Sequence, residues 1–281
     1  HVIRTVGSLI SKIPEHKIHV IAPDIGGGFG NKVGAYPGYI CAIVASIVTG
    51  RPVKWVEDRI ENLSTTAFAR DFFMETEIAA TKDGKVTGLR CYTVADHGAF
   101  DACANATKWP AGLFSIISGS YDFPAAYVSV DGVYTNKAPG GVAYRCSFRV
   151  TEAAYAIERA MDIMAQKLKM DPAEFRMKNL IRREQFPYTS AFGWVYDSGD
   201  YQTALTKAME TVGYKQLREE QKKRQEAFKR GETRELMGIG VAFFTEIVGA
   251  GPSRNCDILG IAMFDSAEIR IHPTGSGICR L

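Results

Sequence analysis

A glycine-rich run at positions 26–30, Gly-Gly-Gly-Phe-Gly, constrains the fold more than any other feature of the chain. Glycine adopts backbone conformations that other residues avoid, so this run predicts a loop. The β-branched apolar stretch 17–22 before it predicts a strand. The stretch 36–49 after it, rich in Ala, Ile and Val, predicts a helix that stops at Gly50. The expected order is therefore strand, glycine loop, helix.

The glycine loop has chemical potential, because four glycines let backbone N–H groups approach an anion or an oxo group closely. The standard phosphate motifs do not fit it. A dinucleotide fingerprint would need glycine where Asn31 stands, and a Walker loop would need Ser or Thr where Val33 stands. The loop alone leaves both a structural turn and a cofactor cradle open. Phe29 is unusual for a simple turn, since its ring must pack or face a ligand.

A second loop, 139–149, carries a single thiol, Cys146, between Arg145 and Arg149 and just before an expected helix start at Thr151. Guanidinium groups and a helix N-terminus both stabilise a thiolate. A thiolate is a nucleophile or a soft metal ligand. The alternative, a small buried apolar cysteine, is disfavoured because the two arginines on the same loop need solvent.

The remaining patterns predict mixed helices and strands, an α+β (mixed α/β) fold. The expected strands are 53–57, 72–80, 86–96, 125–134, 238–248, 259–264 and 268–272, with a hairpin turn at 82–85. The expected helices are 151–168, 172–180, 200–212 and 216–230, the last a charged, solvated one. The expected irregular segments are 58–69, 97–123 (irregular or partly helical) and 181–199.

Composition excludes several classes of protein. The 281 residues are 46% hydrophobic with a net charge of +3, which indicates a globular chain and gives no sign of a nucleic-acid partner. The apolar run 39–48 is too short to cross a bilayer, so we expect no integral membrane segment. Six cysteines without a CxxC pair favour a reducing, cytoplasmic compartment.

Zinc and hydrolytic chemistry are also disfavoured. The five histidines form no ligand pair at helical or zinc-finger spacing. Asp96, His97 and Asp101 lie close together in sequence, but no Ser or Cys nucleophile in a recognisable elbow accompanies them.

Three stretches together, 25–32, 51–59 and 143–149, closely resemble the large, molybdenum-binding subunits of aerobic carbon monoxide dehydrogenases, a branch of the xanthine dehydrogenase family of molybdenum hydroxylases. The resemblance runs nearly end to end. The glycine-phenylalanine loop is shared across that family. The Ala-Tyr-Arg-Cys-Ser-Phe-Arg loop resembles the signature of the CO-oxidising branch and is the more specific of the two.

The resemblance implies that Cys146 binds Cu(I) through its sulfur, and that a sulfido ligand bridges the copper to molybdenum. Thiolate is the ligand type that selects Cu(I), so the chemistry agrees. Arg145 would stand beside the metals as a fixed positive charge and contact the cofactor. Tyr144 and Phe148 would line a small apolar pocket that admits CO.

The same resemblance places four residues of the glycine loop against the molybdenum end of a molybdopterin cytosine dinucleotide: Gly27, Gly28, Phe29 and Gly30. The implied reaction turns CO and water into carbon dioxide, two protons and two electrons. The electrons would leave through [2Fe-2S] clusters on a small subunit and FAD on a medium subunit, in a dimer of heterotrimers. That complex would be cytoplasmic or associated with the inner face of the cytoplasmic membrane.

The implied domains are a first cofactor-binding subdomain at 1–235 and the truncated start of a second at 236–281. The family's site also uses a glutamine that would precede His1 and a glutamate that would follow Leu281. We therefore expect the isolated chain neither to retain the cofactor nor to oxidise CO. Two alternatives remain: a molybdenum hydroxylase that oxidises an aldehyde or a purine, and an inactive truncated chain that acts as an interaction piece.

Overall fold

The computed structural model describes residues 2–29, 31–32, 34–66, 71–99, 116–138, 150–245 and 267–280. The chain divides into two compact units. Unit 1 comprises His1–Glu77, Arg90–Ile117 and Tyr127–Ala156, and unit 2 comprises Ile78–Leu89, Ser118–Ala126 and Ile157–Leu281. Among the described helices, none has the length and apolar character needed to cross a membrane.

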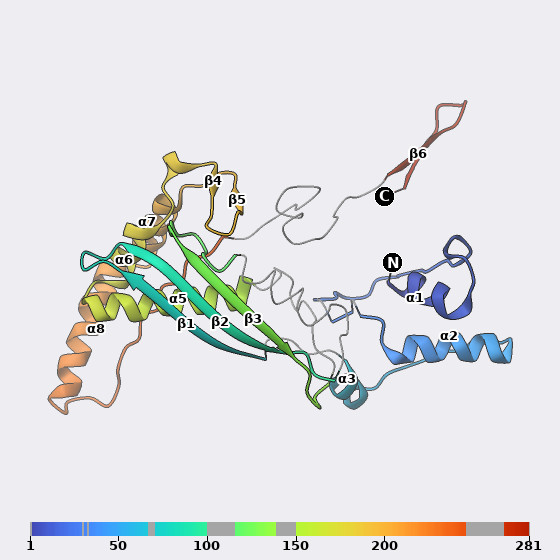
Figure 1. Ribbon diagram of the computed structural model, residues 1–281, viewed down its shortest axis with the longest axis horizontal. Coiled ribbons are helices and arrows are strands. Elements are labelled where there is room, and N and C mark those ends of the chain that lie inside the picture. Colours follow the sequence, from blue (N-terminus) through green and yellow to red (C-terminus); the bar gives the residue numbers. More distant parts are fainter. Residues whose placement is uncertain are drawn as a thin grey trace. The chain divides into compact units, whose positions relative to one another are not determined.

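Three strands form the main sheet in the order β1-β2-β3: β1 (Phe72–Ala80), β2 (Val86–Asp96) and β3 (Ala126–Val133) (Figure 1). The predicted hairpin and the third strand are thus confirmed. The backbone N–H of Leu89 donates to Ala125 O and that of His97 to Val133 O, with the same offset along both strands. A constant offset is the pattern of parallel strands, so the carboxyl ends of β2 and β3 lie at the same end of the sheet.

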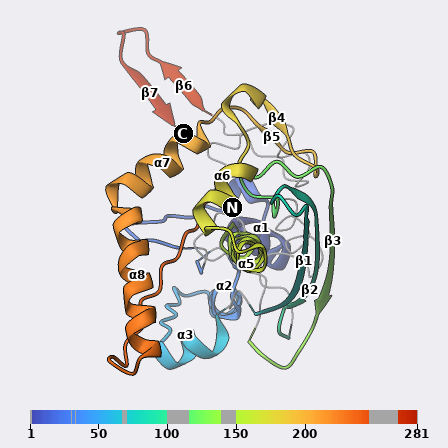
Figure 2. The ribbon, with the colours of Figure 1, turned by 90° about the vertical axis from the view of Figure 1, so that its left-hand side faces the viewer.

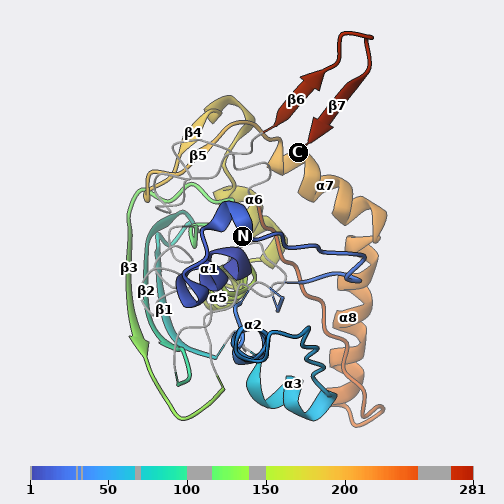
Figure 3. The same cartoon turned by 90° about the vertical axis from the view of Figure 1, so that its right-hand side faces the viewer.

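Unit 1 contains helices α1 (Val2–Ser11), α2 (Pro37–Thr49) and α3 (Arg59–Thr65), and the 3₁₀ helix η1 (Glu15–Lys17). Helices α1 and α2 pack side by side (Figure 3). The sequence predicts α2 correctly, because proline begins the helix and Gly50 ends it with a left-handed φ of 63°. Helix α1 was not predicted.

Three expectations in unit 1 are wrong. The segments 17–22 and 53–57 form no strand, because no partner strand pairs with them among the described residues. The segment expected to be irregular at 58–69 contains α3. A capping box starts this helix: Glu61 N donates to Asp58 Oδ1 over 2.8 Å, and Asp58 N donates to Glu61 Oε2 over 3.0 Å.

Helix α5 (Val150–Leu168) confirms the predicted helix at 151–168, and its residues from Ile157 onward belong to unit 2. The other elements of unit 2 are α6 (Pro172–Asn179), η3 (Arg183–Gln185), β4 (Tyr188–Thr189), β5 (Val195–Tyr196), α7 (Tyr201–Thr211), α8 (Tyr214–Lys229), β6 (Glu268–Ile271) and β7 (Gly277–Arg280). Helix α7 packs against both α6 and α8 (Figure 2). The core of the unit is apolar and at most 2% exposed at Ile157, Met161, Phe175, Leu180 and Ile181.

The helices expected at 172–180, 200–212 and 216–230 and the strand expected at 268–272 are confirmed. The small β4–β5 hairpin was missed, because two-residue strands lie below any sequence periodicity. The described part of 238–248 forms no strand, and 259–264 lies outside the described residues. The mixed fold class is confirmed.

Candidate functional site

The glycine loop takes a left-handed backbone at three residues. The φ angles are 71° at Gly26, 96° at Gly27 and 50° at Phe29. Glycine adopts such angles without steric cost, whereas an aromatic residue does not. Phe29 is therefore held in a strained conformation, of the kind that clusters at ligand-binding sites. The structure thus supports the interpretation that Phe29 is unusual for a simple turn.

The Phe29 ring folds back over the glycines, although the residue is 60% exposed. A Cβ atom added to Gly27 would lie 2.9 Å from Cε2 of this ring. No other residue fits at position 27 unless the ring moves. The space beside Gly27 is therefore taken by the ring, whereas nothing lies within 4 Å of a Cβ added to Gly26.

Hydrogen bonds hold the two ends of the glycine loop together. Lys32 Nζ donates to Ile25 O, and Asn31 N donates to Gly28 O over 3.0 Å. Tyr36, which is 6% exposed, donates its hydroxyl to Asn31 O over 2.6 Å and immediately precedes α2. The start of the helix and the loop are therefore held as one local structure.

Three amides at the tip of the loop are available to a ligand. Among the described residues, the N–H groups of Gly26, Gly27 and Gly28 have no hydrogen-bond acceptor. Successive N–H groups in such a turn form a concavity that binds anions or oxo groups. An anionic, oxo-bearing cofactor such as a molybdopterin fits this donor set and the open space beside Gly26, where nothing lies within 4 Å of an added Cβ.

The rest of the predicted site lies outside the described residues. This applies to Gly30 and to all four residues expected from the second loop, namely Tyr144, Arg145, Cys146 and Phe148. The described cysteines are Cys41 and Cys279, which are exposed, and Cys91, which is buried. No group of three His, Cys, Asp or Glu residues in the described ranges is arranged to hold a metal ion.

The sequence does not predict the polar cluster around Asp96, a residue that it suggests only as a member of a hydrolytic triad. Asp96 lies at the end of β2. It accepts hydrogen bonds from Thr135 and Gly98 and forms an ion pair with Lys137. Lys137 stands two residues before the 139–149 loop. No local motif links residues so far apart in sequence, and only the parallel pairing of β2 with the third strand brings them together.

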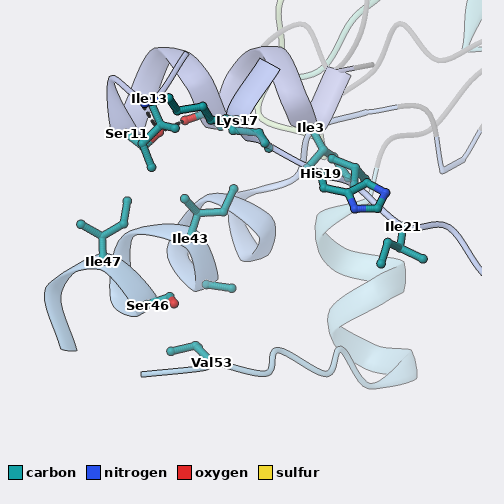
Figure 4. A pocket seen from close by; sticks show the side chains of 14 residues that line it. Ile3, Ser11, Ile13, Lys17, His19, Ile21, Ile43, Ser46, Ile47 and Val53 are labelled. Carbon is teal, nitrogen blue, oxygen red and sulfur yellow. Dashed lines mark hydrogen bonds between the residues drawn. The ribbon is translucent and has the colours of Figure 1, made fainter. Parts of the chain in front are cut away.

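A cavity of about 540 Å³ lies in unit 1 between α1, α2, the segment 17–21 and Val53 (Figure 4). Ile43 and Ile47 rise into it from α2. Most of its lining is aliphatic, with polar groups at Ser11, Lys17, His19 and Ser46. None of the residues predicted for the site lines this cavity.

The chain is similar to the large subunits of several known proteins. It is 74% identical to the carbon monoxide dehydrogenase large chain of Afipia carboxidovorans and 69% identical to that of Hydrogenophaga pseudoflava. Both matches cover all of this chain and 35% of the relative. The nicotine 6-hydroxylase large subunit of Paenarthrobacter nicotinovorans is 33% identical over 98% of this chain and 33% of its own length. The chain thus spans about a third of the length of these relatives.

Solved structures agree. A crystal structure of Cu,Mo-CO dehydrogenase matches with a TM-score of 0.91 and 74% identity, covering 99% of this chain and 35% of that one. Quinoline 2-oxidoreductase from Pseudomonas putida 86 matches with a TM-score of 0.87 and 33% identity, covering 99% and 34%. The family model described as the molybdopterin cofactor-binding domain matches residues 1–180. That match takes in more than half of the residues and the whole glycine loop, and the chain therefore belongs to the molybdopterin cofactor-binding domain family.

Proposed function

We propose that this chain is part of the molybdenum-binding subunit of a carbon monoxide dehydrogenase. The reaction consumes CO and water and yields carbon dioxide, two protons and two electrons. The observation that carries the proposal is the 74% identity, over the whole chain, to a protein named carbon monoxide dehydrogenase large chain. The single thiol in its arginine-flanked loop agrees with the proposal, because thiolate is the ligand type that selects Cu(I).

The glycine loop provides the cofactor contact in this proposal. The amides of Gly26, Gly27 and Gly28 donate to oxo or anionic groups of a molybdopterin cytosine dinucleotide, and Gly30 is a further residue proposed to contact it. The ring of Phe29 lies against Gly27, where an added Cβ would meet it at 2.9 Å, and leaves the exposed side of the loop to the cofactor. The bound metal centre supplies the redox chemistry, while the protein supplies position and electrostatics.

The second loop provides the substrate side. Cys146 holds Cu(I) through its thiolate, and Arg145 next to it contributes a fixed positive charge that favours the thiolate and contacts the cofactor. Tyr144 and Phe148 shape a narrow apolar pocket, which suits a diatomic molecule with almost no dipole.

The electrons leave through partner subunits in this proposal, an iron–sulfur small subunit and an FAD medium subunit, in a dimer of heterotrimers. The complex is cytoplasmic or lies against the inner face of the cytoplasmic membrane. Within this chain, 1–235 forms the first cofactor-binding subdomain and 236–281 begins the second.

A second candidate is a molybdenum hydroxylase that acts on a heterocycle or an aldehyde. The similarity to nicotine 6-hydroxylase and quinoline 2-oxidoreductase favours it, since the same fold serves both of those proteins. Such an enzyme would use the glycine loop but would have no need of a copper-binding thiol. Cys146 is the residue that separates the two candidates.

The test uses the full-length subunit in its assembled enzyme. We expect a dye to be reduced under CO, and no dye to be reduced with an aldehyde or a purine. Reduction with an aldehyde or purine but not with CO would establish the second candidate instead. In the same assay the isolated 281-residue chain should hold no molybdenum and reduce no dye, because it spans about a third of the length of its relatives.

A further inference from the structure

The end of the parallel strand pair is the point from which the Cys146 loop departs. Strand β2 ends at Asp96, and β3 ends at Val133. Backbone pairing continues beyond both ends: Thr135 N donates to Gly98 O over 2.9 Å, and Ala99 N donates to Lys137 O over 3.1 Å. Cys146 follows nine positions after Lys137 in the sequence. The chain therefore enters the loop from a well-ordered pair of strands.

One carboxylate ties these two chain segments together. Asp96 Oδ1 accepts from Gly98 N at 2.7 Å and from Thr135 Oγ1 at 2.8 Å, and Asp96 Oδ2 lies 2.9 Å from Lys137 Nζ. The Asp96 side chain is 11% exposed. Lys137 also pairs with Asp71, whose backbone oxygen accepts from Asp96 N over 3.0 Å. One largely enclosed carboxylate thus joins the end of β2 to Thr135 and Lys137, the segment that leads into the loop.

The charges of this cluster favour the ionised carboxylate. Burial raises the pKa of Asp96, but the Gly98 amide, Lys137 and Thr135 outweigh it and hold the pKa below its usual range. Asp71 and Asp96 in turn raise the pKa of Lys137. An ionised carboxylate only accepts hydrogen bonds, and here every neighbour is a donor. An amide at position 96 would place its own N–H₂ group among donors.

We propose that Asp96 is a positioning residue for the loop that carries Cys146, acting through Thr135 and Lys137. The inference rests on the proposed function, in which Cys146 is the copper ligand. Groups that hydrogen-bond a metal's ligands change metal affinity by about 10–100-fold without touching the metal, and a group that acts through the preceding segment should have an effect at the low end of that range.

The test compares Asp96→Asn and Asp96→Ala with Glu77→Gln in the full-length assembled enzyme. Glu77 is a matched control because it pairs with Arg90 on the same sheet, and both of those side chains are about two-thirds exposed. Two quantities are measured. One is the affinity for Cu(I), by competition with a chelator. The other is the rate at which iodoacetamide alkylates Cys146 after copper removal, by peptide mass.

We expect both Asp96 variants to bind Cu(I) about tenfold more weakly, with a changed alkylation rate at Cys146, while molybdenum content stays as in Glu77→Gln. Unchanged copper affinity and alkylation would overturn the inference. So would a parallel loss of copper, molybdenum and thermal stability, because that pattern marks a purely structural role. If the unsubstituted enzyme binds no copper, the proposed function fails, and the alkylation rates still decide the role of Asp96.

Discussion

The guanidinium of Arg176 donates from Nε to Glu158 Oε2 over 2.7 Å, and the two side chains are 0% and 7% exposed. Arg176 also donates from Nη1 to Asp162 Oδ1 over 2.8 Å. Glu158 accepts further hydrogen bonds from the Tyr121 hydroxyl and from Phe243 N. Burial raises the pKa of Glu158, and Arg176 opposes that rise. The network links α5 and α6 to Tyr121, which precedes them in the chain, and to Phe243, which follows them.

Removing one partner of this pair should be costly. We expect Arg176→Met to lower the free energy of unfolding by about 3–5 kcal/mol, because it leaves the Glu158 carboxylate buried without its partner. Replacing both residues, as Glu158→Leu with Arg176→Met, should recover most of that loss. Urea unfolding followed by fluorescence measures both. The exposed pair Arg224–Glu220 is the control, and its removal should change nothing measurable. An unchanged urea midpoint for Arg176→Met would contradict the account.

Asp171 stabilises unit 2 in three ways, one of which is an ion pair with Arg218 Nε over 3.0 Å. Its carboxylate caps α6 by accepting from Ala173 N over 2.8 Å, and it accepts from the Tyr214 hydroxyl over 3.0 Å. We expect Asp171→Ala to cost about 1–2 kcal/mol from the cap and about 1 kcal/mol more from the lost hydrogen bond. Asp171→Asn should cost less, because an amide oxygen still caps the helix. Equal losses for the two variants, measured by urea unfolding, would show that the cap contributes nothing.

The phenol of Tyr214 predicts a loss of stability in alkali. Burial, together with its hydrogen bond to Asp171, raises the pKa of Tyr214 from 10.0 to about 12, while nearby Arg218 opposes the rise. A folded-state pKa above the unfolded one stabilises the fold at pH values below 10 and loses that effect as the pH rises toward 12. The midpoint temperature of thermal unfolding should therefore fall less steeply between pH 10 and pH 12 in Tyr214→Phe than in the unsubstituted protein. Parallel curves for the two proteins would contradict this assignment.

The glycine loop tests the cofactor contact. We expect Gly27→Ala to lose most of the bound molybdenum in the assembled enzyme, because the added Cβ meets the Phe29 ring and the φ angle of 96° disfavours any side chain. Gly50→Ala is the control: it has a φ of 63° and no neighbouring atom within 4 Å of an added Cβ. It carries a comparable backbone strain away from the loop. Molybdenum contents that match between the two variants would remove the loop from the cofactor site.

Local signals predict much of the fold. Proline and Gly50 define α2, and the cap at Asp171 defines the start of α6. The errors come from information that is not local. The segments 17–22 and 53–57 have the composition of strands, but no partner strand pairs with them among the described residues. The parallel pairing of β2 with β3, which brings Asp96 to Lys137, depends on a crossover that no periodicity shows.

The candidate site, too, is predicted by the sequence only in its local features. Four glycines predict a loop that exposes backbone amides, and the structure has that loop. The positive φ of Phe29 and the fold of its ring over Gly27 depend on how the loop is pinned, which composition does not encode. Arg176 lies in the last turn of α6, where basic residues are common, and the sequence alone would place it on the surface. It is fully buried in the structure, where it pairs with Glu158 on another helix.

In the proposed function, Cys146 makes this domain part of a copper-dependent CO-oxidising site. Metal analysis of the full-length subunit in its assembled enzyme, unsubstituted and as Cys146→Ser, tests it most directly. The account predicts equal amounts of copper and molybdenum in the unsubstituted enzyme, and lost copper with retained molybdenum in Cys146→Ser, since a hydroxyl is a poor ligand for Cu(I). Molybdenum without copper in the unsubstituted enzyme, or copper retained in Cys146→Ser, would contradict it.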